Sequence, residues 1–405
     1  MALSLLALLV FASGLAIPSA NAQSVVATVN LSAGASPQGV AYDSGTGEVF
    51  DANLAGTFSV ISDSTNSVVA NGTLPAGGQP FGVVYDSGKG EVFIVNSGDA
   101  SVSVISDSND RSVATVPVGG TPEGAAYDAA KGEVFVANSL DDTLSVISDS
   151  TAAVVSTVIL PPGSGPYAVA YDSGKGEVFV TGSNDDNVTV VSDATNAVVA
   201  DLPVGSTPEG AAYDSAMGEV FVTNSGDNNV SVISDSTNSV VATIPVGVFP
   251  YGVAYDSARG EMFVANSDSD NVSVISDGDN KVIENVTVGN QPFGVTYDSG
   301  KGEVFVANSG DGTISEISDA ASSSSTATTS ATTSATSTTT STASSATTTI
   351  PVTSSTAAAT TTASTTTSTS GGGGVPVFPY QLATAAAFTI LLAASYLFMR
   401  RRARP

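Results

Sequence analysis

A unit of about 42 residues occurs seven times in this chain. Its clearest marker is a Tyr-Asp pair, and successive pairs are spaced by 43, 42, 44, 42, 42 and 42 residues. Each unit holds four short runs rich in β-branched residues, separated by turns of Gly, Asn, Asp or Ser, as antiparallel strands and tight turns require. A period near 42 with four strands indicates a propeller blade. We therefore predict an all-β fold, a seven-bladed β-propeller. The tyrosines of the pairs are Tyr42, Tyr85, Tyr127, Tyr171, Tyr213, Tyr255 and Tyr297.

The two ends of the repeat region complement each other. The seventh unit stops near Asp319, before a fourth strand. The run Ser24-Val-Val-Ala-Thr28 precedes the first unit and matches Ser239-Val-Val-Ala-Thr243, which lies within the repeat region. An N-terminal strand that completes the last blade would close the ring and leave no blade short of its outer strand. Closure by this strand predicts that deleting residues 23–30 destabilises the whole ring.

The repeat resembles a known family. Runs such as Phe263-Val-Ala-Asn266 and Phe221-Val-Thr-Asn224, followed by Val-Ser-Val-Ile-Ser-Asp and Val-Val-Ala-Thr-Ile-Pro-Val-Gly, are similar to the YVTN-type β-propeller repeat, over roughly residues 24–319. That family includes archaeal surface-layer proteins and many secreted propellers. The resemblance implies the propeller fold and a place at the cell surface. It implies little about activity, because one fold hosts many functions.

The flanking segments predict the location of the protein. Residues 1–22 are apolar and end in Ser19-Ala20-Asn21-Ala22, which is typical of a secretory signal peptide, with a retained anchor as the alternative. We then expect the propeller at 23–319 and a Ser/Thr/Ala-rich and Gly-rich stalk at 320–374. A transmembrane helix is expected at 375–399, and a basic cytoplasmic tail at 400–405. The alternative for this end is a sorting signal that is removed. In either case the propeller faces outward.

The charge pattern limits the partners. All 38 acidic residues lie at or before Asp319, together with only seven of the eleven basic residues. No basic surface expected of a nucleic-acid binder is present. Five basic residues occupy the same turn in different units, and we interpret them as solvated turn charges: Lys89, Lys131, Lys175, Arg259 and Lys301. The acidic excess suits high salt, low pH or divalent cations, and the sequence does not separate these. Six Asn-x-Ser/Thr sites predict N-glycosylation at Asn30, Asn71, Asn187, Asn229, Asn271 and Asn285.

The chain has no Cys, no His and, by composition, no Trp. A Ser-His-Asp triad, a Cys nucleophile and a His-ligated metal site are therefore ruled out. Carboxylate-only or calcium-assisted lyase or lactonase chemistry is the remaining enzymatic hypothesis. We expect a protein that is not an enzyme and has no cofactor, with calcium as the alternative.

Positions that are identical in all units are interpreted as packing positions, including the strand-two phenylalanines and glutamates. Positions that differ are better candidates for binding. The residue after the Pro that opens each inner strand varies, and the resemblance places it at one mouth of the central channel. These seven residues are the predicted ligand site, with a plug or a bare rim as the alternative: Gln38, Phe81, Glu123, Tyr167, Glu209, Tyr251 and Phe293.

The turns between the second and third strands carry neighbouring carboxylates that make them candidate calcium ligands: Asp185, Asp186, Asp268 and Asp270. Their spacing does not match an EF-hand loop, and Asp is also an ordinary turn residue.

The first functional hypothesis is a single-pass membrane protein whose extracellular propeller is a surface-layer-like envelope scaffold. Its partners would be cell-envelope proteins or glycans and the membrane, not nucleic acid. The alternative is a ligand- or glycan-binding adhesin or receptor that uses the channel mouth. The enzyme described above is the third hypothesis.

Overall fold

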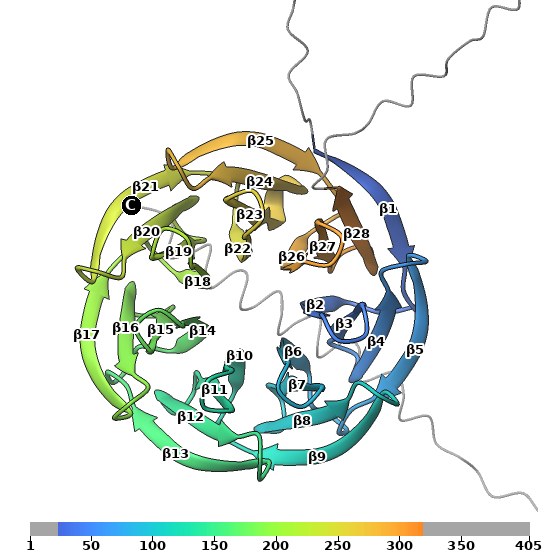
Figure 1. The fold of residues 1–405 in the computed structure, drawn as a ribbon, viewed down its shortest axis with the longest axis horizontal. Helices are drawn as coiled ribbons and strands as arrows, with labels where there is room; N and C mark the ends of the chain where they lie inside the picture. Colours follow the sequence, from blue (N-terminus) through green and yellow to red (C-terminus); the bar gives the residue numbers. More distant parts are fainter. Residues whose placement is uncertain (1–22, 319–405) are drawn as a thin grey trace, which may run out of the picture. The chain divides into compact units, whose positions relative to one another are not determined.

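The computed structural model describes residues 23–318. Within them, seven four-stranded antiparallel sheets are arranged radially around one axis (Figure 1). Each sheet is one blade. Blade 1 contains β2–β5, each later blade takes the next four strands, and blade 7 contains β26, β27, β28 and β1. The predicted all-β, seven-bladed architecture is confirmed.

The four strands of each blade are ordered from the central channel to the outer rim. The innermost strands are β2 (Pro37–Asp43), β6 (Pro80–Asp86), β10 (Pro122–Asp128), β14 (Pro166–Asp172), β18 (Pro208–Asp214), β22 (Pro250–Asp256) and β26 (Pro292–Asp298). The second strands are β3 (Glu48–Asn53), β7 (Glu91–Asn96), β11 (Glu133–Asn138), β15 (Glu177–Gly182), β19 (Glu219–Asn224), β23 (Glu261–Asn266) and β27 (Glu303–Asn308). The third strands are β4 (Thr57–Ser62), β8 (Ser101–Ser106), β12 (Thr143–Ser148), β16 (Asn187–Ser192), β20 (Asn229–Ser234), β24 (Asn271–Ser276) and β28 (Thr313–Ser318). The outer strands are β1 (Ser24–Asn30), β5 (Ser67–Thr73), β9 (Arg111–Pro117), β13 (Ala153–Ile159), β17 (Ala197–Pro203), β21 (Ser239–Pro245) and β25 (Lys281–Thr287).

The N-terminal strand closes the ring. Strand β1 pairs antiparallel with β28, so that Thr28 lies opposite Ser315 and Asn30 opposite Thr313. The backbone N–H of Leu31 continues the contact by donating to the carbonyl of Gly312 at 3.1 Å. Blade 7 therefore gains its outer strand from the other end of the described region, which confirms the predicted closure.

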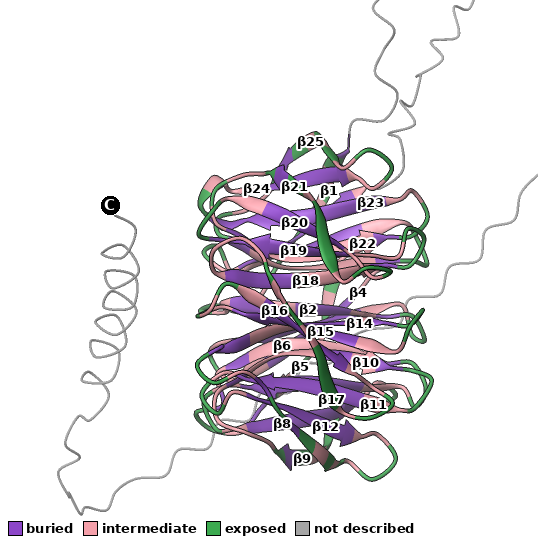
Figure 2. Cartoon of the chain, turned by 90° about the vertical axis from the view of Figure 1, so that its left-hand side faces the viewer, coloured by how far each residue is buried: buried purple, intermediate pink, exposed green. Residues whose placement is uncertain are grey.

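The core lies between blades, not within one sheet. Each interface is filled by apolar side chains of two neighbouring blades, as in the cluster of Phe50 and Val60 from blade 1 with Val92 and Ile94 from blade 2. The strand-two phenylalanines are fully buried wedges, as their repetition predicted. Figure 2 shows that exposed residues are concentrated in the turns and on outer strands such as β17. Alternation of exposed and half-buried residues along these outer strands reflects one packed and one solvated face.

The Tyr-Asp pairs fix the turn between the first and second strands. The Asp86 side chain is fully buried, and its Oδ1 accepts from the backbone N–H groups of Gly88 at 2.8 Å and Lys89 at 3.2 Å. This local bonding is the reason Asp is favoured at such a turn. The turn then ends at a glycine with positive φ, such as Gly218 at 67°.

Tyrosines of the same pairs connect neighbouring blades. The hydroxyl of Tyr171 in blade 4 donates to Asp193 Oδ2 of the same blade at 3.0 Å. Burial, followed by the facing carboxylates Asp193 and, from blade 3, Asp128, raises the pKa of Tyr171. The phenol therefore stays protonated, and the structural role predicted for these tyrosines fits this geometry.

The basic residues in the turns between first and second strands were predicted to be solvated charges, and the structure shows a different role for them. Lys131 of blade 3 forms an ion pair with Asp193 of blade 4, with 3.1 Å between Nζ and Oδ1. Lys89 of blade 2 donates to the carbonyl of Asp149 in blade 3 at 2.5 Å. The amino groups thus reach across to the next blade because the turn projects them sideways. They are contacts between blades and not simply solvated charges.

In the part of the chain that the structure describes, no helix is long and apolar enough to cross a membrane. The predicted signal peptide at 1–22, stalk at 320–374, transmembrane helix at 375–399 and tail at 400–405 lie outside the described residues.

Candidate functional site at the channel mouth

Strand pairing places the predicted ligand residues at one end of the channel. Pro80, which opens β6, lies opposite Asn96, which ends β7, and Pro250 and Asn266 pair in the same way. The residue after each Pro therefore lies at the same end of the ring as the turns between second and third strands. We call this end the channel mouth. The Tyr-Asp turns lie at the opposite end of the inner strands.

Four aromatic side chains from four blades meet at this mouth. Phe81 of blade 2 contacts Tyr167 of blade 4 edge-on, with ring centroids 5.5 Å apart, and Phe293 of blade 7, with centroids 5.2 Å apart. Tyr251 of blade 6 stacks on Phe293 at 4.2 Å. Rings from opposite sides of the ring of blades touch one another, so they pack across the channel. This arrangement is closer to the predicted plug than to an open, aromatic-lined mouth.

Two glutamates flank the aromatic cluster. Glu209 of blade 5 is 9% exposed, and among the described residues no donor contacts its Oε2 atom. Burial raises its pKa to about 7, and the charge of Glu123 in blade 3 contributes to the rise. Burial likewise raises the pKa of Glu123 to about 7, although Ser97 Oγ donates to its Oε1 at 3.2 Å. The two carboxyl groups therefore titrate near neutral pH.

The glutamates and tyrosines affect one another electrostatically. After burial, the charge of Glu209 is the largest cause that raises the pKa of Tyr167 and of Tyr251, and Glu123 acts on Tyr167 as well. Both phenols therefore stay protonated and keep a hydroxyl donor. We refer to Phe81, Glu123, Tyr167, Glu209, Tyr251 and Phe293 as the mouth cluster.

The seventh predicted ligand residue has another role. Gln38 of blade 1 is buried, and its Nε2 donates to Ser309 Oγ of blade 7 at 2.7 Å. The same group also reaches the carbonyl of Pro37 at 3.2 Å. Its amide is therefore engaged in a contact between blades 7 and 1, and it stands apart from the mouth cluster.

Two further residues at the mouth were missed by the sequence analysis. Phe249 has φ of 59°, a conformation that is unusual for a bulky residue, and its ring lies 5.3 Å from that of Tyr251. Its neighbour Val248 is 47% exposed. The signal was available, because the two positions before this Pro hold only Ala, Gly, Ser, Asn, Gln or Thr in the other units, whereas this unit has Val-Phe.

The interior of the ring behind the mouth contains a cavity of about 390 Å³. It is lined by inner-strand residues from β6, β10, β14 and β18, which are small or aliphatic side chains and Tyr85, Tyr127, Tyr171 and Tyr213. The mouth cluster residues are absent from this lining, and the tyrosines belong to the opposite end of the strands. The cavity is therefore separate from the mouth.

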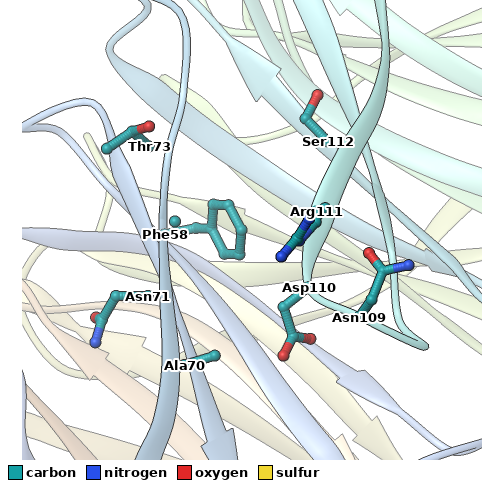
Figure 3. A pocket seen from close by; sticks show the side chains of 9 residues that line it. Phe58, Ala70, Asn71, Thr73, Asn109, Asp110, Arg111 and Ser112 are labelled. Atoms are coloured by element: carbon teal, nitrogen blue, oxygen red, sulfur yellow. The ribbon is translucent and has the colours of Figure 1, made fainter.

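A larger cavity of about 460 Å³ lies between the outer parts of blades 1 and 2 (Figure 3). The Phe58 ring projects into it from β4, with Asp110 and Arg111 on the facing side. Gly72 of β5 forms part of the wall, and any side chain there would collide with that ring. The cavity exists because one blade pairs a large residue with a glycine, so we assign it to packing and not to the site.

Three of the four candidate calcium ligands accept hydrogen bonds from backbone N–H groups. Asp186 Oδ1 accepts from the N–H of Thr207 at 2.9 Å, and Asp270 Oδ1 accepts from the N–H of Gln291 at 3.0 Å. Asp185 Oδ1 accepts from the N–H of Asn187 at 3.3 Å, and Asp268 lies in the short helix η1 (Ser267–Ser269). Within residues 23–318, no three carboxylates are placed to hold one metal ion. These turns thus bring no calcium cage together.

The predicted glycosylation sites differ in exposure. Asn30, Asn71 and Asn285 lie exposed on outer strands, whereas Asn187, Asn229 and Asn271 are half-buried at the start of third strands. Asn229 Oδ1 accepts from Asn224 at 2.7 Å, and Asn271 makes the equivalent contact with Asn266 at 2.8 Å. The exposed three are the better acceptors by geometry.

Comparison with solved structures places the fold among known propellers. The chain is similar to a hydrazine synthase structure from Kuenenia stuttgartiensis, with 16% identity, a TM-score of 0.63 and coverage of 72% of this chain and 97% of that one. It is equally similar to a streptogramin B lyase structure, with 16% identity, TM-score 0.62 and coverage of 72% and 96%. A virginiamycin B lyase from Staphylococcus aureus matches at 14% identity and TM-score 0.63, with coverage of 72% and 98%. No family model and no curated protein matches the chain.

These neighbours overturn one expectation. We expected a protein that is not an enzyme, yet the three similar structures named above carry the names of enzymes. The missing His and Cys residues exclude particular mechanisms only, and the fold itself is compatible with catalysis. At such low identity the likeness shows the fold alone. The resemblance to YVTN-type surface proteins stays a prediction.

Proposed function

We propose that the propeller receives a small ligand at the channel mouth, through the mouth cluster, whose ring-to-ring contacts would part to admit it. The observation that supports this most is Glu209, a buried carboxyl group that interacts with Ser225 but has one oxygen to which no described residue donates a hydrogen bond. Leaving such a group unpaired costs on the order of 1–3 kcal/mol. A ligand group that pairs with it would recover that energy.

The position of Phe249 supports the same proposal. Its left-handed backbone conformation is shared by the equivalent turn residues Gln79, Thr121, Thr207 and Gln291, so only this blade presents a bulky aromatic ring from that turn position. Together with Val248 it extends the apolar surface of the mouth beyond the Tyr251 ring. A ligand with an apolar body would bury this surface.

A second candidate function is lyase-type chemistry by carboxylates. Glu123 and Glu209 both have a pKa of about 7, and a general acid or base works best when its pKa is close to the operating pH. One carboxylate would remove a proton from the substrate, and the other carboxyl group would protonate the leaving group. The lyase names of the structural neighbours favour this candidate over a passive scaffold.

Location and partners remain part of the proposal. The terminal segments favour a protein held at the cell surface by a C-terminal membrane helix, with envelope proteins or glycans as partners. The scaffold hypothesis and the YVTN-type surface-layer likeness both depend on those segments and on the repeat pattern. Ligand capture at the mouth is independent of them.

The test is a thermal-shift screen of the full-length protein with amines, sugars, carboxylic acids and lactones. We expect at least one class to raise the melting temperature of the native protein. The shift should disappear in the double variant Phe81→Ala/Tyr251→Ala. Leu140→Ala, an exposed apolar residue in a turn at the same end, is the matched control and should keep the shift. Equal shifts in all three proteins would contradict a site at the mouth.

A further inference from the structure

We propose that the channel mouth recognises an organic cation, a protonated amine or guanidinium group carried on an apolar body. This inference rests on the proposed function and names its ligand class. Two independent observations support it: the two glutamates of the mouth cluster, of which Glu209 is buried and Glu123 half-buried, and the distribution of basic residues over the described ring.

The mouth cluster offers the two kinds of partner that an organic cation requires. Glu209 presents a buried oxygen with no donor from residues 23–318, and Glu123 lies close enough to influence its charge. The charge of Glu209 acts on Tyr251, whose ring stacks on Phe293, and Phe293 in turn contacts Phe81. Cations are attracted to aromatic faces, and the gain grows when water is excluded. An anion would instead face two carboxylates.

The second observation is that every basic residue of the described region lies away from the mouth. Five follow the inner strands in the Tyr-Asp turns, and the other two, Arg111 and Lys281, begin outer strands β9 and β25. An outer strand begins where a third strand ends, for instance Arg111 opposite Ser106, which is the Tyr-Asp end of the blade. No Lys or Arg within 23–318 is therefore available at the mouth to neutralise Glu123 or Glu209.

The turns at the mouth carry carboxylates as well, among them Asp141, Asp227 and Asp311. A face with charges of one sign attracts counter-ions and accelerates the approach of oppositely charged ligands. The mouth thus combines long-range attraction for a cation with two carboxyl groups and aromatic rings at its centre.

Proton linkage distinguishes a cation from a neutral ligand. Because the glutamates have a pKa of about 7, each is largely protonated below pH 7 without ligand. A bound cation favours the ionised form, so binding releases a proton and the affinity rises with pH through neutrality. Up to roughly tenfold per pH unit is expected for each proton released. A neutral ligand of the same shape lacks this dependence.

The experiment uses the full-length protein and a matched pair of probes, phenethylammonium and its neutral counterpart 2-phenylethanol. Calorimetric titrations at pH 6 and pH 8 measure both affinities. We expect phenethylammonium to bind at least tenfold more tightly at pH 8 than at pH 6, with 2-phenylethanol weaker and insensitive to pH. Glu209→Gln should lose at least tenfold for the cation. Glu177→Gln, which changes the recurrent strand-two glutamate at the other end of a blade, should bind like the native protein.

Each other outcome contradicts the inference in a recognisable way. Equal affinities for the two probes would show that the mouth recognises the apolar body alone. Binding of a sugar or acid that depends on Phe81 and Tyr251, without binding of the amine, would retain the proposed function and refute the cation. If no tested compound binds in a way that depends on the mouth cluster, both the proposed function and the cation inference are refuted. The probe comparison on the native protein stands even if the Glu209 variant fails to fold.

Discussion

Replacing Glu316 with valine should stabilise the propeller at neutral pH. Glu316 lies in β28 and is 1% exposed. The other six blades have a fully buried valine at this position: Val60, Val104, Val146, Val190, Val232 and Val274. The side chain follows Ile314 on the same face of β28, and Ile314 packs in the cluster between blades 7 and 1. We call this interface the closing seam.

The facing position of the next blade is also exceptional at this seam. Strand two carries Asp51 in blade 1, 0% exposed, where the other blades have Ile94, Val136, Val180, Val222, Val264 and Val306. Asp51 alternates with Val49, which also packs in the cluster between blades 7 and 1. Among the seven interfaces of the described ring, only the closing seam has carboxylates at these two positions. Each has one oxygen that no described donor contacts.

The stability that Glu316 costs the native protein at pH 7 can be worked out from its pKa. Burial, and then the facing carboxyl group of Glu303, raises it from 4.5 to about 8, with Asp298 raising it and Lys301 lowering it slightly. A shift of this size would lower the free energy of unfolding by roughly 3.4 kcal/mol at pH 7 relative to low pH, because the unfolded chain releases the proton that the folded protein keeps. Glu303 and Lys301 have side chains 22% and 35% exposed, so water screens the pair and we expect about 2 kcal/mol.

The direction of the pH dependence follows from the raised pKa. The folded protein holds its proton more tightly than the unfolded chain does, so this stability is fully present below pH 4.5 and is lost as the pH rises towards 8. Valine has no proton to lose and also fills the site with apolar atoms. The gain from Glu316→Val should therefore be about 3 kcal/mol at pH 7 and about 1 kcal/mol at pH 4.

The assay is urea unfolding of the native protein and the variant at pH 4, 5.5, 7 and 8. Glu316→Gln is the matched control, because it removes the titration but keeps a polar group, and it should flatten the pH dependence with a smaller gain. A variant whose urea midpoint falls in parallel with the native one between pH 5.5 and 8, or lies below it at pH 7, would refute the argument.

Three further predictions concern the ring. Asp51→Val should also reduce the loss of stability above pH 5, because burial raises the pKa of Asp51 to about 7. Its gain in stability should be smaller than that of Glu316→Val, since the variant loses the 2.9 Å hydrogen bond that the Ser59 N–H donates to Asp51. An unchanged pH profile in urea unfolding would contradict this prediction. Gly72→Val should destabilise blade 1 by about 3 kcal/mol, because the new side chain collides with Phe58. The double variant Phe58→Val/Gly72→Val reproduces the pair that Val102 and Val116 form in blade 2, and it should recover all but about 1 kcal/mol of that loss. If Gly72→Val costs as much in the Phe58→Val protein as in the native protein, the coupling is refuted. Deleting residues 23–30 should lower the melting temperature of the whole ring, because β28 loses its only partner on that side; an unchanged melting temperature would exclude closure by β1.

The fold was predictable because seven copies of one pattern fix the period, the strands and the closure together. The position of the variable residues at one end of the inner strands was predictable for the complementary reason, since they vary against a constant background, whereas their binding role stays a prediction. The contact of Phe81 with Phe293 and Tyr167 was not predictable. Whether such rings line a mouth or meet across it depends on the distance between inner strands, which no local pattern encodes.

The closing seam shows a different limit. Glu316 and Asp51 are visible as departures from the repeat, but they are 265 positions apart in the chain. Only the ring places the third strand of blade 7 against the second strand of blade 1. Likewise, the separation of every basic residue of 23–318 from the mouth follows from strand direction, which the sequence does not state.

The seam and the mouth respond to pH in opposite senses. Protonation keeps the buried carboxyl groups of Glu316 and Asp51 neutral and favours the closed ring, so stability declines as the pH rises from 4.5 towards 8. Ionisation of Glu123 and Glu209 favours the proposed cation, so affinity increases through pH 7. Binding would then be tightest where the ring is least stable, and a bound cation would restore part of that stability because it binds only the folded ring. A melting temperature that rises with phenethylammonium at pH 8 but not at pH 5 would be the combined signature of both sites.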